Sequence, residues 1–266
     1  MKLSIYQVDA FSDRVFGGNP AAVCPLDRWP GDELLQAIAA ENNLAETAFY
    51  VRGSDGYDLR WFTPTTEVDL CGHATLATGF VLLDVLGTGH GRDETIRFST
   101  RGGALEVARA GEGLVLTLPA HPPAPCDPPP QLLEGLARPP VEVLTAANYL
   151  AVYDDEEEIL EIRPDFARLA ECHPRGVIVT APGRDVDFVS RFFAPSFGIP
   201  EDPVTGSAHS TLTPYWAARL GKLRLRARQV SARRGELVCE LLGDRVALEG
   251  RCALYLEGTI EIPDYP

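Results

Sequence analysis

The residues best suited to chemistry occur in two short motifs, Cys71-Gly72-His73 and Thr205-Gly206-Ser207. Each motif stands where a loop gives way to a long apolar segment, so each predicts the N-terminus of a helix. The first backbone N–H groups of a helix have no partner inside the helix, and glycine lets a ligand approach them closely. Such a terminus binds carboxylate or phosphate. Taken alone, each glycine is explained by a tight turn, but the pair favours an anion pocket.

Three titratable side chains accompany these motifs. His73 can donate a hydrogen bond or hold a proton near neutral pH. Glu46 stands at the start of an apolar strand, where partial desolvation would suit a proton shuttle. On composition alone, however, Glu46 is more typical of a solvated turn carboxylate. Asp202 precedes Pro203, which is common turn chemistry, although it could instead accept a hydrogen bond from a substrate amine or hydroxyl.

The two motifs differ in a way that bears on mechanism. Cys71 aligns with Thr205. A thiol at a helix N-terminus is activated, and two such thiols would permit a two-base racemase. Threonine cannot serve as a base at neutral pH, so the pattern favours a single base. An amino-acid racemase or epimerase that uses Cys71 and another base is kept as an alternative.

The elements that must position these residues form an internal repeat. The run Arg60-Trp61-Phe62-Thr63-Pro64 leads to the first motif, and Arg191-Phe192-Phe193-Ala194-Pro195 leads to the second. We therefore expect two similar halves that face each other across a cleft holding the site. Seven prolines between 119 and 130 mark the boundary. The expected halves are 1–118 and 119–255, and the last strand, about 256–266, could return to the first.

Each half is expected to pack several strands on one long helix, which makes the fold class α+β. The strands nearest the site are expected at 47–52 and 58–63 in the first half and at 186–193 and 225–231 in the second. The expected helices are 31–42, 73–86, 155–161, 165–171 and 207–220.

Composition excludes several classes of function. The chain has 266 residues and a net charge of −14, which repels nucleic acid and anionic membranes. The only lysines, Lys2 and Lys222, lie outside the motifs, and no Walker A or H-E-x-x-H sequence occurs. Six cysteines without a C-x-x-C pair argue against structural zinc. With no apolar run of about 20 residues and no signal-peptide pattern, we expect a cytoplasmic protein without cofactor or metal.

An ordered set of motifs resembles the PhzF family, the phenazine-biosynthesis isomerase group. They span nearly the whole chain: Gln7-Val8-Asp9-Ala10-Phe11, Gly17-Gly18-Asn19-Pro20-Ala21-Ala22-Val23, Asn43-Leu44-Ala45-Glu46-Thr47-Ala48-Phe49, Arg60-Trp61-Phe62-Thr63-Pro64, Leu70-Cys71-Gly72-His73-Ala74-Thr75-Leu76-Ala77 and Glu201-Asp202-Pro203-Val204-Thr205-Gly206-Ser207-Ala208.

The resemblance implies a diaminopimelate epimerase-like fold, with two pseudo-symmetric barrel-like halves that each wrap a central helix. It implies a cofactor-independent isomerase that acts on a small anionic carboxylate, of the type that isomerises trans-2,3-dihydro-3-hydroxyanthranilate, and a homodimer. The family's proton-transferring glutamate falls on Glu46, and its substrate-orienting residues fall on His73 and Asp202. Its contacts to the substrate carboxylate fall on Gly72, Gly206 and Ser207. A non-catalytic small-molecule-binding homodimer is the remaining alternative.

Overall fold

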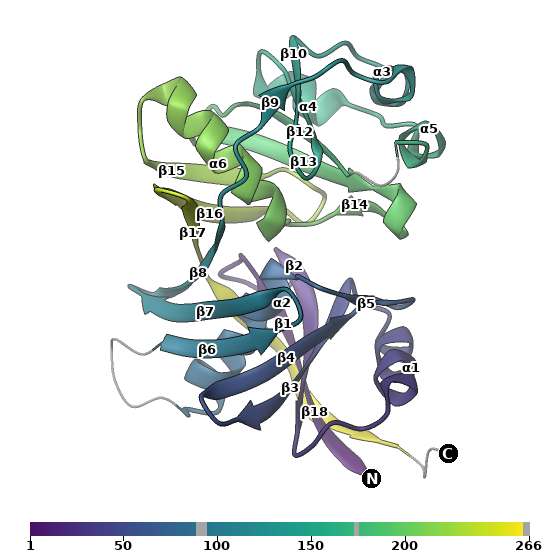
Figure 1. Ribbon diagram of the computed structural model, residues 1–266, viewed down its shortest axis with the longest axis vertical. Coiled ribbons are helices and arrows are strands. Elements are labelled where there is room, and N and C mark those ends of the chain that lie inside the picture. The colour runs from purple at the N-terminus through teal and green to yellow at the C-terminus, as the bar shows by residue number, and fades with distance from the viewer. Residues whose placement is uncertain (89–94, 173–175, 263–266) are drawn as a thin grey trace. The chain divides into compact units, whose positions relative to one another are not determined.

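The computed structural model describes residues 1–88, 95–172 and 176–262. The chain forms two compact units, Met1–Thr117 with Glu249–Pro266 and Leu118–Leu248 (Figure 1). Within the described ranges, none of the helices is long and apolar enough to cross a bilayer.

The first unit is a continuous succession of paired strands. β1 pairs antiparallel with both β18 and β2, and β2 runs parallel to β3. β4 pairs antiparallel with β3 and β5 and parallel with β6, and β6, β7 and β8 continue antiparallel. The strands are β1 Lys2–Ala10, β2 Asn19–Leu26, β3 Glu46–Gly53, β4 Gly56–Phe62, β5 Glu67–Val68, β6 Thr95–Thr100, β7 Gly103–Ala110, β8 Gly113–Pro119 and β18 Cys252–Glu261, and the helices are α1 Asp32–Asn42 and α2 Gly72–Phe80.

The second unit repeats this order of pairing. β11 runs parallel to β12, β12 pairs antiparallel with β13, and β13 pairs with the short β14 and, in parallel, with β15. The strands are β9 Ala124–Pro125, β10 Glu142–Thr145, β11 Tyr149–Val152, β12 Val177–Pro182, β13 Phe188–Ala194, β14 Ile199–Asp202, β15 Arg224–Gln229, β16 Gly235–Leu242 and β17 Arg245–Gly250, and the helices are α3 Pro130–Leu136, α4 Glu156–Glu161, α5 Phe166–Ala170 and α6 Gly206–Leu220.

The two units therefore have equivalent parts. β2, β3 and β4 correspond to β11, β12 and β13, and α2 corresponds to α6. The ends of the repeat also match, because β9 pairs antiparallel with β10 as β18 pairs with β1. The last strand, whose destination the sequence left open, thus joins the first unit. Pseudo-symmetry of this kind places Gly72 and Gly206 at the same point of each unit.

Helix α2 is the centre of the first unit. Every residue from Gly72 to Gly79 is buried, and the helix contacts β1, β2, β3, β7 and β18. A Cβ atom at Gly79 would lie 2.5 Å from Val107 Cγ1, so glycine is what allows the helix to lie against β7. The helix continues as a π-turn over Val81–Val85, where the Leu86 N–H donates to the Val81 carbonyl.

Helix α6 fills the same role in the second unit and is largely buried. It contains Pro214, which cannot donate to the carbonyl of Ser210 one turn earlier. The backbone N–H of His121 donates to that carbonyl at 2.9 Å and supplies the missing bond. The proline is therefore tolerated inside the helix without leaving a buried acceptor unsatisfied.

The smaller helices complete the cores. In the first unit, Leu35 and Ile38 of α1 pack with Phe49 and Phe62 on one side of the sheet. In the second unit, α3 was not expected, because it starts inside the proline-rich segment. Pro130 occupies its first turn, where the missing N–H costs nothing.

Candidate functional site

The first unit brings Glu46 and His73 together. Glu46 is the first residue of β3, and His73 is the second residue of α2. Glu46 Oε2 lies 3.2 Å from His73 Nε2, and both side chains are buried, at 11% and 5% exposure. The Glu46 carboxylate is thus not the solvated turn group that composition alone favours. Burial lowers the pKa of His73 to about 3, so the imidazole is neutral at pH 7.

The other ring nitrogen of His73 also has close neighbours. The Asn19 Nδ2 lies 3.1 Å from His73 Nδ1, and the Cys71 Sγ lies 3.5 Å from the same atom. Asn19 is the first residue of β2 and is fully buried. Cys71 is the N-cap residue of α2, so its thiol belongs to this cluster rather than to a remote part of the core.

Among the described residues, this cluster brings together three side chains of the types that bind metal ions. Ligand atoms of Glu46, Cys71 and His73 lie within 4.8 Å of one another. Cys71, however, approaches Nδ1 of the ring, whereas Glu46 approaches Nε2. Contacts on opposite nitrogens favour a chain of polar contacts through the imidazole over one shared ion.

The start of α2 provides donors beside this cluster. Cys71 has extended backbone angles, and its side chain makes no capping hydrogen bond to the helix. The first N–H groups, which begin at the buried Gly72, therefore have no side-chain cap. Uncapped N–H groups and the positive end of the helix dipole together attract an anion.

The second unit holds Asp202 in an equally defined place. Asp202 ends β14 and is buried, and the Thr205 hydroxyl donates to its Oδ2. Gln229, at the end of β15, fixes the same loop: its Oε1 accepts from the Thr205 N–H at 2.9 Å, and its Nε2 donates to the Asp202 carbonyl at 2.7 Å. Gln229 does not stand out in the sequence, because its partners lie 24 and 27 residues away along the chain.

Gly206 and Ser207 open helix α6. Thr205 is its N-cap residue, but the hydroxyl is committed to Asp202 and makes no capping bond. Gly206 is buried and Ser207 is half-buried. The N-termini of α2 and α6 thus share two properties: each begins at a glycine, and neither has a side-chain cap. That both termini serve one cleft stays a prediction.

His209 lies deeper in α6 and does something else. Its Nδ1 lies 2.8 Å from the Thr205 carbonyl, an acceptor, so Nδ1 carries the proton. The ring is fully buried beside Phe188, and burial lowers its pKa to about 4. Asp69, which matches Asp202 in the repeat, is instead exposed and lies near Arg101. The two aspartates at this place of the repeat therefore have different surroundings.

A pair of arginines supports both loops that lead to the helices. Arg60 on β4 makes a bidentate contact with Glu67 of β5, at 2.7 and 2.9 Å. Arg191 on β13 makes the same contact with Glu201 of β14, at 2.7 and 2.9 Å. Hydrogen bonds from Arg60 hold the pKa of Glu67 below its usual range. The arginine motifs were visible in the sequence echo, but their glutamate partners were missed.

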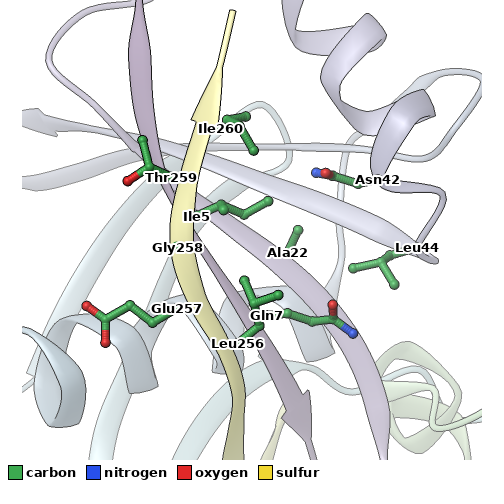
Figure 2. A pocket seen from close by; sticks show the side chains of 10 residues that line it. All are labelled: Ile5, Gln7, Ala22, Asn42, Leu44, Leu256, Glu257, Gly258, Thr259 and Ile260. Atoms are coloured by element: carbon green, nitrogen blue, oxygen red, sulfur yellow. The ribbon is translucent and has the colours of Figure 1, made fainter.

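A separate cavity of about 350 Å³ lies in the first unit (Figure 2). It is lined by Ile5, Gln7, Ala22, Leu44 and Leu256, among others, and β18 crosses beside it. Glu46 and His73 do not line it. Its lining is mostly apolar and contains none of the catalytic or substrate-binding residues predicted from the sequence.

Comparisons with known proteins agree with this architecture. The family model of phenazine biosynthesis-like proteins, PhzC-PhzF, matches residues 8–258. An uncharacterised isomerase of Pseudomonas aeruginosa is 55% identical over 262 residues, which is 98% of this chain and 100% of that protein. A crystal structure of a PhzF-family phenazine biosynthesis protein from Enterococcus faecalis matches with a TM-score of 0.93 at 44% identity, over 98% of this chain and 100% of that one.

A more distant match extends the fold relationship. A hydroxyproline epimerase from Agrobacterium vitis matches with a TM-score of 0.63 at 12% identity, over 97% of this chain and 92% of that one. At that identity the match concerns the fold alone. The expected epimerase-like fold with two similar halves is confirmed. The chain belongs to the PhzC-PhzF family of phenazine biosynthesis-like proteins and is an isomerase-like member of it.

Proposed function

We propose that this protein is a cofactor-independent isomerase of a small carboxylate, of the trans-2,3-dihydro-3-hydroxyanthranilate isomerase type, in which Glu46 is the only base. The observation that carries the proposal is the buried contact of 3.2 Å between Glu46 and His73 beside the start of α2. A carboxylate in this position can take a proton from carbon and return it. An imidazole that stays neutral at pH 7 can donate one hydrogen bond without competing for that proton.

The proposed proton transfer is balanced within the substrate. Glu46 takes a proton from an activated carbon, and the electron pair of the broken C–H bond shifts into the substrate's unsaturated system. The protonated Glu46 then returns the proton to a different carbon, which regenerates the carboxylate. No oxidant or reductant takes part. A positioned acid–base group supplies roughly 10²–10⁴-fold in rate, and the rest must come from orientation and exclusion of water.

The substrate carboxylate is assigned to the helix N-termini. The support is that α2 and α6 each start at a buried glycine without a side-chain cap. In this proposal Gly72, Gly206 and Ser207 bind the carboxylate, and Asp202 accepts a hydrogen bond from a substrate amine or hydroxyl. Local donors of this kind are needed because the net charge of −14 repels anions.

Hydrogen exchange with solvent tests the proposal. The protein is incubated in D₂O with trans-2,3-dihydro-3-hydroxyanthranilate and with a panel of small amino and hydroxy carboxylates, and deuterium at carbon is followed by mass spectrometry. Glu46→Gln should still bind the ligand that exchanges but should abolish the exchange. Glu41→Gln, on the exposed face of α1, is the matched control and should leave the exchange unchanged. Exchange by Glu46→Gln at the normal rate would refute the role of Glu46, and binding without exchange by the unaltered protein would favour a non-catalytic binder.

A racemase or epimerase remains a second candidate because of one observation. The Cys71 thiol lies in the same cluster as Glu46 and His73, within 4.8 Å. A two-base enzyme would invert a stereocentre and would lose turnover, but not ligand affinity, in Cys71→Ala. An isomerase that relies on Glu46 alone would keep its exchange activity in this variant.

The protein is also proposed to act as a homodimer, which the family resemblance implies. Light scattering of the purified chain tests this, and a monomer at micromolar concentration would contradict it.

A further inference from the structure

We propose that Asn19 is a positioning residue that holds the neutral ring of His73 in its Nε2–H tautomer, with Nε2 3.2 Å from Glu46 Oε2. The effect of Asn19 on catalysis rests on the proposed function, whereas its effect on the His73 tautomer does not. Asn19 stands in the Gly17-Gly18-Asn19-Pro20 motif of the family resemblance.

The geometry of the amide determines where the proton lies. Asn19 Nδ2 lies 3.1 Å from His73 Nδ1, and an amide nitrogen can only donate. The Cys71 Sγ, 3.5 Å from the same ring atom, is a second potential donor to it. A nitrogen that accepts carries no proton. A neutral imidazole has one proton, which must therefore be on Nε2, 3.2 Å from Glu46 Oε2.

The chain holds Asn19 rigidly. Asn19 is fully buried, pairs with Ala10 across β1 and β2, and is followed by Pro20. Gly18 before it has φ +60°, and a Cβ atom there would lie 2.1 Å from the Ala10 carbonyl oxygen. The loop is closed further by Asp9, whose Oδ2 accepts from the Phe16 N–H at 2.7 Å.

The reverse tautomer would work against catalysis. With the proton on Nδ1, the Nε2 lone pair would face the Glu46 carboxylate, and Asn19 Nδ2 would meet an N–H group. The titratable groups that the described residues place against the ring are Glu46 from β3 and Cys71 from the start of α2. Burial opposes protonation of both nitrogens, since it lowers the pKa of His73 to about 3. Hydrogen bonds from the neighbours of the ring therefore determine which of its two nitrogens carries the single proton.

Nitrogen NMR of the resting protein tests the proposal without any substrate. In protein labelled with ¹⁵N-histidine at pH 7, two-bond ¹H–¹⁵N correlations assign the tautomer of each ring, and His73→Gln identifies the His73 signals. The proposal predicts a neutral His73 with its proton on Nε2. A proton on Nδ1 would overturn it.

Asn19→Asp adds a second test with almost no change in size. The carboxylate now accepts from the ring, so the proton should move to Nδ1 or a second proton should bind, and the pH dependence of the His73 signals should shift upward. The exchange rate in D₂O should fall by about 10–100-fold, the range found when the hydrogen-bond partner of a metal-binding histidine is altered. Unchanged His73 signals and an unchanged exchange–pH profile in a folded variant would refute the role of Asn19.

The chain offers a matched control in the repeat. Asn148 is the counterpart of Asn19, and its Oδ1 accepts from the Gly176 N–H at 2.9 Å. Asn148→Asp should leave the His73 signals and the exchange–pH profile as they are. The proposal for Asn19 and the proposed function can be refuted independently. A His73 proton on Nδ1 would refute the role of Asn19 but not the role of Glu46 tested by Glu46→Gln. Absence of exchange activity would refute the isomerase function but not the tautomer measured by NMR.

Discussion

Acid pH should destabilise the folded protein partly through His73. The folded ring has a pKa of about 3 because it is buried, whereas an unfolded histidine has a pKa of about 6.5. Between these values the unfolded state binds a proton that the folded state does not. Stability therefore rises with pH across this range and is lost as the pH falls.

The size of the effect follows from linkage. Lowering the pH from about 7 to about 5 protonates the unfolded histidine almost fully and leaves the folded ring neutral, which costs roughly 2 kcal/mol of unfolding free energy. The variant His73→Gln has no imidazole to titrate, so it lacks this pH-dependent loss of stability. This holds whatever the substitution does to stability at neutral pH. The gap in stability between the unaltered protein and this variant should therefore change by about 2 kcal/mol between the two pH values.

Urea unfolding followed by tryptophan fluorescence measures this gap at both pH values. His209→Gln is a parallel case, because burial lowers the pKa of His209 to about 4, and it should remove a nearly equal share. The reasoning is refuted if the unaltered protein and His73→Gln lose the same free energy on acidification. The folded His73 would then titrate like an exposed histidine, and its assignment as a neutral donor would fail.

Three further substitutions probe the supports of the site. Gln229→Leu removes the amide that fixes the loop before α6. It should lower the free energy of unfolding in urea by about 2–3 kcal/mol and should slow hydrogen exchange of the substrate. Full exchange activity would show that this loop needs no such support. Gly79→Ala places a Cβ atom 2.5 Å from Val107 Cγ1 and should lower the free energy of unfolding by about 1–2 kcal/mol. A second substitution, Val107→Ala, should restore this stability. No loss of stability in Gly79→Ala would mean that α2 does not lie so close to β7. Arg191→Lys loses the bidentate contact with Glu201 and should cost about 2 kcal/mol in the same assay, and a neutral result would show that the contact is not made in solution.

The elements that carry the site could be read from the sequence because their patterns are local. The apolar runs after Gly72 and Gly206 predicted both central helices, and the structure starts each helix at its glycine. The strand that begins at Glu46 followed from its β-branched and aromatic residues. The internal repeat also predicted strand topology, because similar sequence patterns in the two halves predict that equivalent strands pair in the same order.

Features that depend on distant partners were missed. Glu67 and Glu201 look like surface carboxylates in sequence, and only the folded hairpins bring them to Arg60 and Arg191. In the sequence, Cys71 stands out only as a thiol at the start of a helix, whereas the folded chain brings its Sγ to 3.5 Å from His73 Nδ1. The helix at Pro130 was missed because a high density of proline hides the one position in a helix where proline is favourable.

A crystal structure with a bound small carboxylate, such as anthranilate, tests the central claim most directly. The account predicts that the ligand carboxylate accepts from the first N–H groups of α2 at about 2.7–3.2 Å. It also predicts a ring carbon within about 3.5 Å of a Glu46 carboxylate oxygen, as proton transfer requires. A ligand bound elsewhere, or a Glu46 side chain that points into solvent in the complex, would contradict the claim that Glu46 moves the proton.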